Sequence, residues 1–149
     1  MAFPKTILVS TDFSTCSDDA LLYAIQLASG MKSEKIVLLH AYVTPAMAFP
    51  SAAEALSPEI VTSIVTLAEE GLWSRADQVR AAGIAVETCL RDGDPRDEIL
   101  QACDDYQADL ICLGTHGRRG LSHMLIGSVA ERIVRAAKVP VLTVREGSV

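Results

Sequence analysis

The sequence predicts an α/β fold, in which a single domain is built on an open, five-stranded parallel sheet with helices on both faces. Half of the 149 residues are hydrophobic and 21% are charged, a composition typical of one globular domain. Short apolar runs alternate along the chain with longer segments of helical spacing. The apolar runs are continuous, which is typical of parallel strands that are covered on both faces.

The first strand is predicted at residues 5–10, where Lys5 precedes a β-branched apolar run. The polar residues 11–14 then form a turn. Ser14 or Ser17 can cap the helix that follows, and Gly30 is expected to end it.

The second strand is predicted at residues 35–43. Residues 44–58 contain three prolines and no periodic pattern, so we expect a mobile loop there. Helical spacing from Glu59 to Gly83 predicts the longest helix. Its expected buried face consists of Ile60, Ile64, Leu67, Ala68, Leu72 and Val79.

A third strand is expected at residues 84–90, and a fourth at residues 108–113. Between them, Asp94 as N-cap with Pro95 as the first helical residue predicts a helix. The last helix begins after Gly127, and a fifth strand follows at residues 139–144. We expect Val129, Ile133, Val134 and Ala137 on the buried face of that helix. No repeat or linker divides residues 1–149.

Composition excludes several classes of function. The chain shows no signal peptide and no membrane span, so we expect a cytoplasmic protein without a membrane partner. The net charge of −6 argues against nucleic-acid binding. The cysteines lack CxxC spacing and the histidines lack an HExxH pattern, so neither a disulfide framework nor a structural metal site is expected.

The positive charge is concentrated near the C-terminus. Residues 1–113 contain 7 basic and 17 acidic residues, a net charge of −10, whereas residues 114–149 contain 6 and 2, a net charge of +4. An anionic ligand would be attracted to that segment. A solvated helix face and a basic strand end account for part of the same cluster.

The segment after the fourth strand has the layout of a phosphate cradle. Gly114 and Gly117 follow the strand, and Gly127-Ser128 opens a helix whose N–H groups favour phosphate. An ordinary surface loop is the alternative. Neither a P-loop, GxxxxGK[ST], nor a Rossmann GxGxxG after the first strand is present. If the first and fourth strands are neighbours, residues 10–12 face the same crevice as this segment.

The spacing G-x2-G-x9-G-S from Gly114 to Ser128 resembles the nucleotide-binding signature of the universal stress protein family. The runs at residues 7–14, 37–41 and 139–144 agree with that family, and residues 44–58 match it least. The resemblance implies one universal stress protein domain, with an adenine nucleotide alpha hydrolase-like, Rossmann-like fold. Because the fifth strand is also expected at a sheet edge, we expect a homodimer through residues 139–144.

The resemblance implies a site for an adenine nucleotide. Asp12 would lie at the ribose or adenine, and the glycines with Ser128 would surround the phosphates. His116 and Arg118 are candidates for the terminal phosphates, although a loop arginine is more often solvated. The expected nucleotide-binding residues are Ser10, Thr11, Asp12, Ala41, Gly114, Thr115, His116, Gly117, Arg118, Gly127, Ser128, Val129 and Ala130.

Two of these residues have structural alternatives. Asp12 can cap the first helix or its turn. Ser128 and Glu131 form a capping-box pattern, in which Ser128 would bond the third helical N–H group. The sequence does not decide between a cap and a phosphate ligand at Ser128.

The function expected from the resemblance is a stress-response regulator or sensor that binds ATP, with AMP or ADP as alternatives and Mg²⁺ as the companion of ATP. No residue stands out as a general base, so no catalytic residue is assigned and a slow ATPase activity is the upper limit. The alternative is a stress protein that binds no nucleotide and acts through protein partners.

Overall fold

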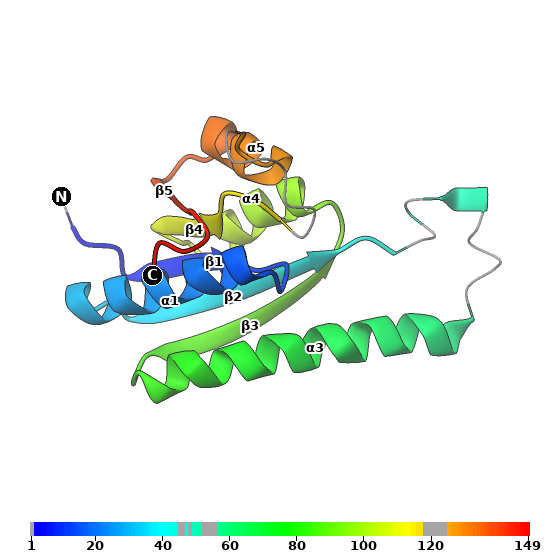
Figure 1. Cartoon of the computed structure of the whole chain (residues 1–149), viewed down its shortest axis with the longest axis horizontal. Helices are drawn as coiled ribbons and strands as arrows, with labels where there is room; N and C mark the ends of the chain where they lie inside the picture. Colours follow the sequence, from blue (N-terminus) through cyan, green and yellow to red (C-terminus); the bar gives the residue numbers. More distant parts are fainter. Residues whose placement is uncertain (1, 45–46, 48, 52–56, 118–124) are drawn as a thin grey trace.

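A computed structural model describes residues 2–44, 47, 49–51, 57–117 and 125–149. Its centre is a five-stranded sheet with the strand order β3-β2-β1-β4-β5, in which every pairing is parallel (Figure 1). This confirms the predicted fold class. The strands are β1 (Thr6–Ser10), β2 (Lys35–Tyr42), β3 (Ala85–Asp92), β4 (Leu110–Gly114) and β5 (Val141–Val144).

Helices cover both faces of the sheet. In Figure 1, α1 and α3 lie on one side of the strands, and α4 and α5 lie on the other. The helices are α1 (Thr15–Met31), α3 (Pro58–Ala81), α4 (Pro95–Asp105) and α5 (Ser128–Ala136). In the described part of the chain, no helix is long and apolar enough to cross a membrane.

Each face of the sheet contributes to its own hydrophobic core. Successive side chains of a strand point to opposite faces, so Ile7 and Val9 of β1 pack with α1 and α3, whereas Leu8 packs with α4 and α5. All three are fully buried. The four cysteines are also buried as free thiols. Burial raises the pKa of Cys112 to about 12, so this thiol remains neutral in the core.

Two helix starts agree with the sequence analysis, and one helix end does not. Ser14 is the N-cap of α1, and Asp94 is the N-cap of α4 with Pro95 at its first turn. The prediction that Gly30 ends α1 is wrong. The helix continues to Met31, and Lys32 provides the left-handed C-cap with φ 56°. A non-glycine residue thus adopts the backbone conformation that was expected of glycine.

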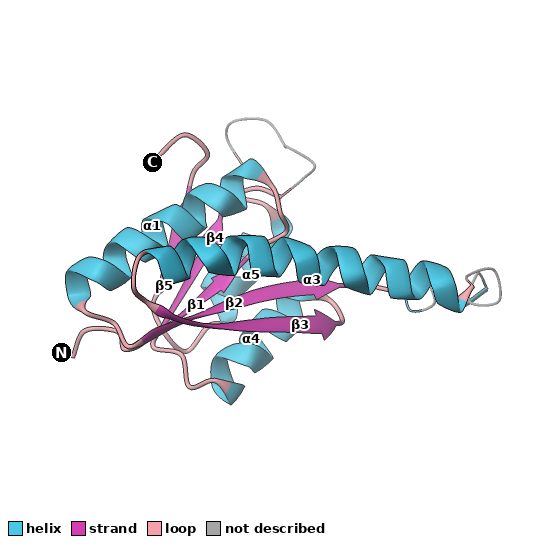
Figure 2. Ribbon diagram, turned by 90° about the horizontal axis from the view of Figure 1, so that it is seen from below, coloured by secondary structure: helices cyan, strands magenta, loops and turns pink. Residues whose placement is uncertain are grey.

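The buried face of α3 is shorter than predicted. Ala68, Leu72 and Val79 are buried as expected, but Ile60 is 46% and Leu67 is 67% exposed. Figure 2 shows that the beginning of α3 extends past the carboxyl ends of the strands, where no sheet lies beneath it. Leu67 directly precedes the buried Ala68, so its exposure reflects the side of the helix on which it lies. Helical periodicity therefore identified the apolar residues without showing where the sheet ends.

Two other expectations concern the buried face of α5 and the proline-rich segment. In α5, Ile133 is buried, but Val134 is 52% exposed, so its predicted burial is wrong. The expected mobile loop at residues 44–58 lies largely outside the described residues, since 45–46, 48 and 52–56 are not described.

The strand order places the site. β1 pairs with β2 on one side and with β4 on the other. The chain therefore reverses its direction of travel across the sheet between β1 and β4, which is where open parallel sheets bind their ligands. The condition set by the sequence analysis, that the first and fourth strands be neighbours, is met.

Candidate functional site

A cavity of about 380 Å³ opens at the carboxyl ends of β1 and β4. All the predicted binding residues except Arg118 line it, and Arg118 lies outside the described residues. The lining residues are Ser10, Thr11, Asp12, Ser17, Ala41, Pro95, Leu113, Gly114, Thr115, His116, Gly117, Gly127, Ser128, Val129 and Ala130.

Three lining residues were not expected from the sequence, namely Ser17, Pro95 and Leu113. Each had been given a structural explanation as a helix cap, a first helical residue or a strand residue. A signal was nevertheless present for Pro95. It follows the carboxyl end of β3 in a parallel sheet, and all such ends meet at one edge.

The turn between β1 and α1 forms one wall of the cavity. The Thr11 N–H donates to the Leu39 carbonyl at 2.8 Å, which extends the pairing with β2. The Thr11 hydroxyl oxygen accepts from the Phe13 N–H at 3.0 Å and lies 3.1 Å from the Ser17 hydroxyl. Thr11 is only 3% exposed, so these bonds satisfy a buried polar side chain.

Asp12 belongs both to the turn before α1 and to the cavity wall. Its Oδ1 accepts from the Ser14 N–H at 3.0 Å and from the Ser14 hydroxyl, and Ser14 in turn caps α1. Asp12 therefore supports the turn before the helix and is not the N-cap itself. The residue also lines the cavity.

The glycines of the G-x2-G-x9-G-S spacing are needed for close packing. A Cβ on Gly114 would lie 2.8 Å from the Cys16 sulfur, and one on Gly117 would lie 2.8 Å from Oδ2 of Asp12. A Cβ on Gly127 would lie 3.0 Å from the Thr115 carbonyl oxygen. None of the three has a positive φ; the described glycines that do are Gly83 and Gly147. Missing side chains, and not unusual dihedrals, explain these positions.

The start of α5 rules out the capping box. Gly127 is the N-cap, with φ −62° and ψ 155°, and no side chain caps the helix. Ser128 is already the first helical residue, and Glu131 forms an ion pair with Arg135 at 2.9 Å. The capping-box interpretation is wrong because a glycine takes the N-cap position. The first N–H groups of α5 lack acceptors within the helix and carry its positive partial charge into the cavity wall.

His116 presents a buried nitrogen to this region. Its Nδ1 lies 2.9 Å from the Thr115 hydroxyl. Its Nε2 is buried and is the one buried side-chain nitrogen or oxygen without a hydrogen-bond partner within the described ranges. Because an unpaired buried polar atom is costly, such an atom in a cavity wall is a candidate for ligand contact.

Three of the described arginines line a second hollow and not the cavity. In the part of the chain that the structure describes, the lining contains no lysine and no arginine. Arg96, Arg132 and Arg135 line a second, more open hollow, which shares Ser128 with the cavity and also includes Asp97 and Glu131. Among the described residues, the start of α5 supplies the positive potential in the cavity wall.

The chemistry of the cavity is that of hydrogen-bond recognition. Backbone N–H groups and hydroxyls can bind phosphate oxygens, and the Asp12 carboxylate can accept from sugar hydroxyls. Among the residues that the structure describes, no group of three His, Cys, Asp or Glu side chains could hold a metal ion.

Comparison with known proteins agrees with this architecture. The sequence model of the Universal stress protein family matches residues 4–145. Universal stress protein MJ0531 of Methanocaldococcus jannaschii is 33% identical over 145 residues, covering 95% of this chain and 82% of the relative.

Two solved structures extend the comparison to three dimensions. The structure of protein MJ0577 superposes with a TM-score of 0.85 at 26% identity, covering 100% of both chains. A universal stress protein solved in complex with cAMP has a TM-score of 0.69 at 28% identity, covering 97% of this chain and 98% of that one.

Proposed function

The chain belongs to the universal stress protein family, and we propose that it binds an adenine nucleotide, ATP in the first place, in the cavity beside β1 and β4. One observation carries the proposal: the start of α5, the glycine backbone and the Asp12 carboxylate meet in a single cavity. The relative in complex with cAMP supports the choice of an adenine nucleotide.

In this proposal each wall of the cavity recognises one part of the nucleotide. The backbone at Ala41 contacts the base, and Asp12 accepts hydrogen bonds from the ribose. The N–H groups of residues 128–130 and the Ser128 hydroxyl bind the phosphates at the positive end of α5. His116 Nε2, buried and without a protein partner, gains a hydrogen-bond partner from the ligand.

The proposed role is binding with at most slow hydrolysis. Rapid phosphoryl transfer needs a positioned lysine or arginine and a group that orients the nucleophile. No lysine or arginine is found among the described lining residues. Mg²⁺ would enter with the phosphates of ATP, since it usually keeps several waters and few protein ligands. ADP and AMP fit the same recognition with fewer phosphate contacts.

We further propose a cytoplasmic regulator or sensor in the stress response that works as a homodimer. β5 is an edge strand of the sheet, and an exposed edge offers backbone groups for pairing with a second copy. Pairing of β5 in one copy with β5 in the other would cover the β5 edge of each sheet.

Titration with a fluorescent ATP analogue tests nucleotide binding directly. We expect saturable binding that unlabelled ATP, ADP and AMP compete away. Asp12→Asn keeps the shape of the side chain but removes its charge, and should weaken binding roughly tenfold. Mass spectrometry of nucleotide released from freshly purified protein would identify the natural ligand.

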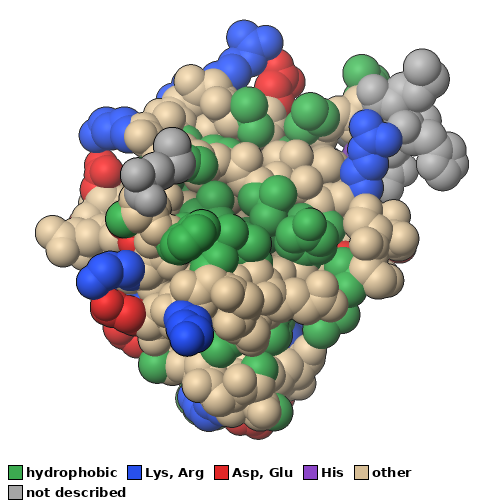
Figure 3. Space-filling view, turned by 90° about the vertical axis from the view of Figure 1, so that its left-hand side faces the viewer, with side chains coloured by type: hydrophobic (Ala, Val, Ile, Leu, Met, Phe, Trp, Pro, Cys, Tyr) green, Lys and Arg blue, Asp and Glu red, His purple; other side chains and the backbone are tan. Residues whose placement is uncertain are grey.

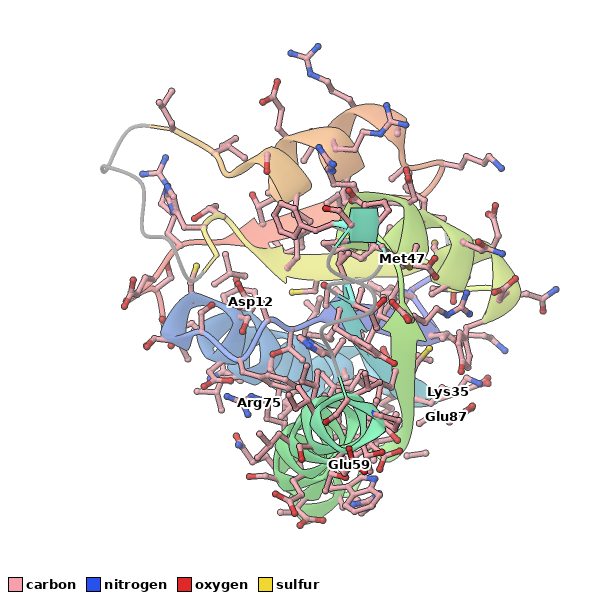
Figure 4. All side chains as sticks on the ribbon, turned by 90° about the vertical axis from the view of Figure 1, so that its right-hand side faces the viewer. Asp12, Lys35, Met47, Glu59, Arg75 and Glu87 are labelled. Carbon is pink, nitrogen blue, oxygen red and sulfur yellow. The ribbon has the colours of Figure 1, made fainter. Side chains whose placement is uncertain are left out.

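The competing function is a protein that acts through partners alone. Exposed apolar side chains on α3 favour it, since Leu67 is 67% and Trp73 is 54% exposed. Figure 3 also shows hydrophobic side chains gathered in the middle of one face, opposite the side that Figure 4 presents. A titration without saturable binding up to about 1 mM nucleotide would reject the first proposal in favour of this one.

A further inference from the structure

We propose that Arg75 and Phe13, which do not line the cavity, are positioning residues that hold Asp12 for binding the ribose. Arg75 projects from α3 toward the turn that carries Asp12 (Figure 4). The inference rests on the proposed nucleotide function and adds a part of the site that lies outside the cavity wall.

The backbone of Phe13 makes the turn around Asp12. Phe13 has φ 66°, a left-handed conformation that is a clear outlier for a bulky side chain. Its N–H donates to the Thr11 hydroxyl oxygen at 3.0 Å. The reversal brings the Ser14 N–H and hydroxyl onto Oδ1 of Asp12. Such strained residues persist only where the surrounding structure holds them, and they cluster at functional sites.

Three residues from β2 and α3 hold the Phe13 ring. The His40 ring stacks on it with centroids 4.2 Å apart and an angle of 28°. The Arg75 guanidinium lies 4.8 Å from the ring centroid, within the range of a cation–π contact. α3 has a glycine where the ring packs, since a Cβ on Gly71 would lie 2.9 Å from it.

The same side chains anchor the carbonyl groups of the two residues on either side of Asp12. Nδ1 of His40 lies 2.8 Å from the Thr11 carbonyl oxygen, on the amino side of Asp12. Nη2 of Arg75 donates to the Phe13 carbonyl oxygen at 3.3 Å, on the carboxyl side. The backbone is therefore anchored on both sides of Asp12, and the Ser14 N–H and hydroxyl hold the carboxylate itself.

Arg75 is itself held in a fork. Its Nε donates to Oδ1 of Asp18 at 2.5 Å, and its Nη2 donates to Oδ2 at 3.0 Å. The Arg75 side chain is only 16% exposed. A planar two-point bond of this kind fixes the direction of the guanidinium, which a lysine could not do. α1 and α3 thus set the position of the Phe13 turn together.

Ribose recognition separates this role from a purely structural one. If Arg75 acts through Asp12, its loss should weaken a ligand with ribose hydroxyls and spare one without them. We expect Arg75→Met to raise the dissociation constant of ATP about tenfold and that of 2′,3′-dideoxy-ATP less than about twofold. Arg75→Lys should bind ATP more tightly than Arg75→Met but more weakly than the wild type, because lysine keeps the charge and loses the two-point bond.

A matched control and a double-mutant cycle complete the test. Arg80→Met removes an exposed ion pair with Asp77 on the same helix, and should change neither dissociation constant. In the Asp12→Ala background, Arg75→Met should have no further effect on ATP binding, because the carboxylate that Arg75 positions is absent. Asp18→Asn weakens the same fork from α1 and provides a second variant should Arg75→Met fail to fold.

The outcomes separate this inference from the proposed function. Equal losses for the two nucleotides, additive effects with Asp12→Ala, or no change in either constant would overturn the positioning role while nucleotide binding stands. If wild-type protein binds neither nucleotide, the proposed function fails and the positioning role falls with it. A crystal structure of Arg75→Met in which the turn at Phe13 is unchanged would overturn the inference without reference to any nucleotide.

Discussion

Gly114 and Gly127 occupy positions where an added side chain would meet the protein before it met a ligand. The nearest atoms to a Cβ on Gly114 belong to Cys16 of α1, and those to a Cβ on Gly127 belong to Thr115 and His116. These glycines let three segments approach closely enough to form one cavity wall. Their effect on a ligand is therefore indirect, through the position of the backbone.

Gly114→Ala should lower the free energy of unfolding by about 1–3 kcal/mol, the usual cost of forcing an extra methyl group into a packed site. The new Cβ would lie 2.8 Å from the Cys16 sulfur and 3.1 Å from its carbonyl carbon. Urea denaturation measures the change. Cys16→Ala in the same chain should restore only part of the loss, because the backbone contact remains.

Gly30→Ala is the matched control. Gly30 lies in α1, and a Cβ there would have nothing within 4 Å. We expect this change to raise the free energy of unfolding by roughly 0.5–1 kcal/mol, as alanine is the better helix residue. Equal effects of the two substitutions would show that packing at Gly114 is not what requires glycine.

Ser128→Ala separates phosphate binding from helix capping. Because Gly127 is the N-cap, the loss of the Ser128 hydroxyl should change the free energy of unfolding by less than about 0.5 kcal/mol. Affinity for ATP should fall about three- to tenfold, since one hydrogen bond to a charged ligand is lost. Thermal unfolding and nucleotide titration of one preparation give both values. A loss of stability near 1 kcal/mol, the usual effect of removing a serine cap, would restore the capping interpretation.

At the scale of secondary structure, α4 and α5, which cover the same face of the sheet, begin in different ways. α4 has a side-chain cap from Asp94, while α5 begins at a glycine and leaves its first turn uncapped by any side chain. Both starts border the cavity, α4 through Pro95 and α5 through Ser128, but only the first N–H groups of α5 have no side-chain acceptor among the described residues.

Asp94→Ala should lower the free energy of unfolding by about 1 kcal/mol at neutral pH. Hydrogen bonds from the Arg96 side chain and N–H hold the pKa of the Asp94 carboxyl below its ordinary value. A carboxyl whose pKa is lowered by folding stabilises the folded state above its unfolded pKa, and this contribution is lost as the pH falls through the folded pKa. The difference between wild type and variant should therefore shrink toward about pH 3.

Urea denaturation at both pH values measures this change, and Asp94→Asn provides the control. Asparagine caps helices about as well as aspartate but does not titrate. Its stability difference from Asp94→Ala should persist in acid. A wild-type advantage over Asp94→Ala that does not vary with pH would show that the charge of Asp94 contributes nothing to the cap.

At the scale of the whole molecule, the strand order assembles the cavity. The turn after β1, the end of β2, the loop after β4 and the starts of α4 and α5 come from distant parts of the chain, yet all border one space. Parallel strands make this possible because their carboxyl ends lie at one edge. The same order leaves β5 at the edge of the sheet, where a second copy can pair.

Size-exclusion chromatography with light scattering tests the homodimer, and we expect twice the mass of one chain at micromolar concentration. The carbonyls of Pro140 and Val144 accept hydrogen bonds from the β4 side, so the backbone groups of Thr143 face the open edge. Thr143→Pro removes an outward N–H and should give a monomer. Thr143→Val keeps that N–H and should remain a dimer. A monomeric wild type would contradict assembly through β5.

The α/β class, the approximate positions of all five strands, the start of α4 at Asp94 and Pro95, and most of the residues that border the cavity could be predicted from the sequence. Patterns of burial and turn chemistry are local, so they can be recognised without coordinates. That these residues bind a nucleotide remains a prediction.

The folded structure was needed to show why Gly114 must be glycine, how far the sheet supports α3, and that Gly127 occupies the N-cap position of α5. It also brought Arg75 to the carbonyl of Phe13, 62 residues away in the sequence. The reason is physical. These features depend on distances between atoms of segments that are remote along the chain, and residue spacing does not record such distances.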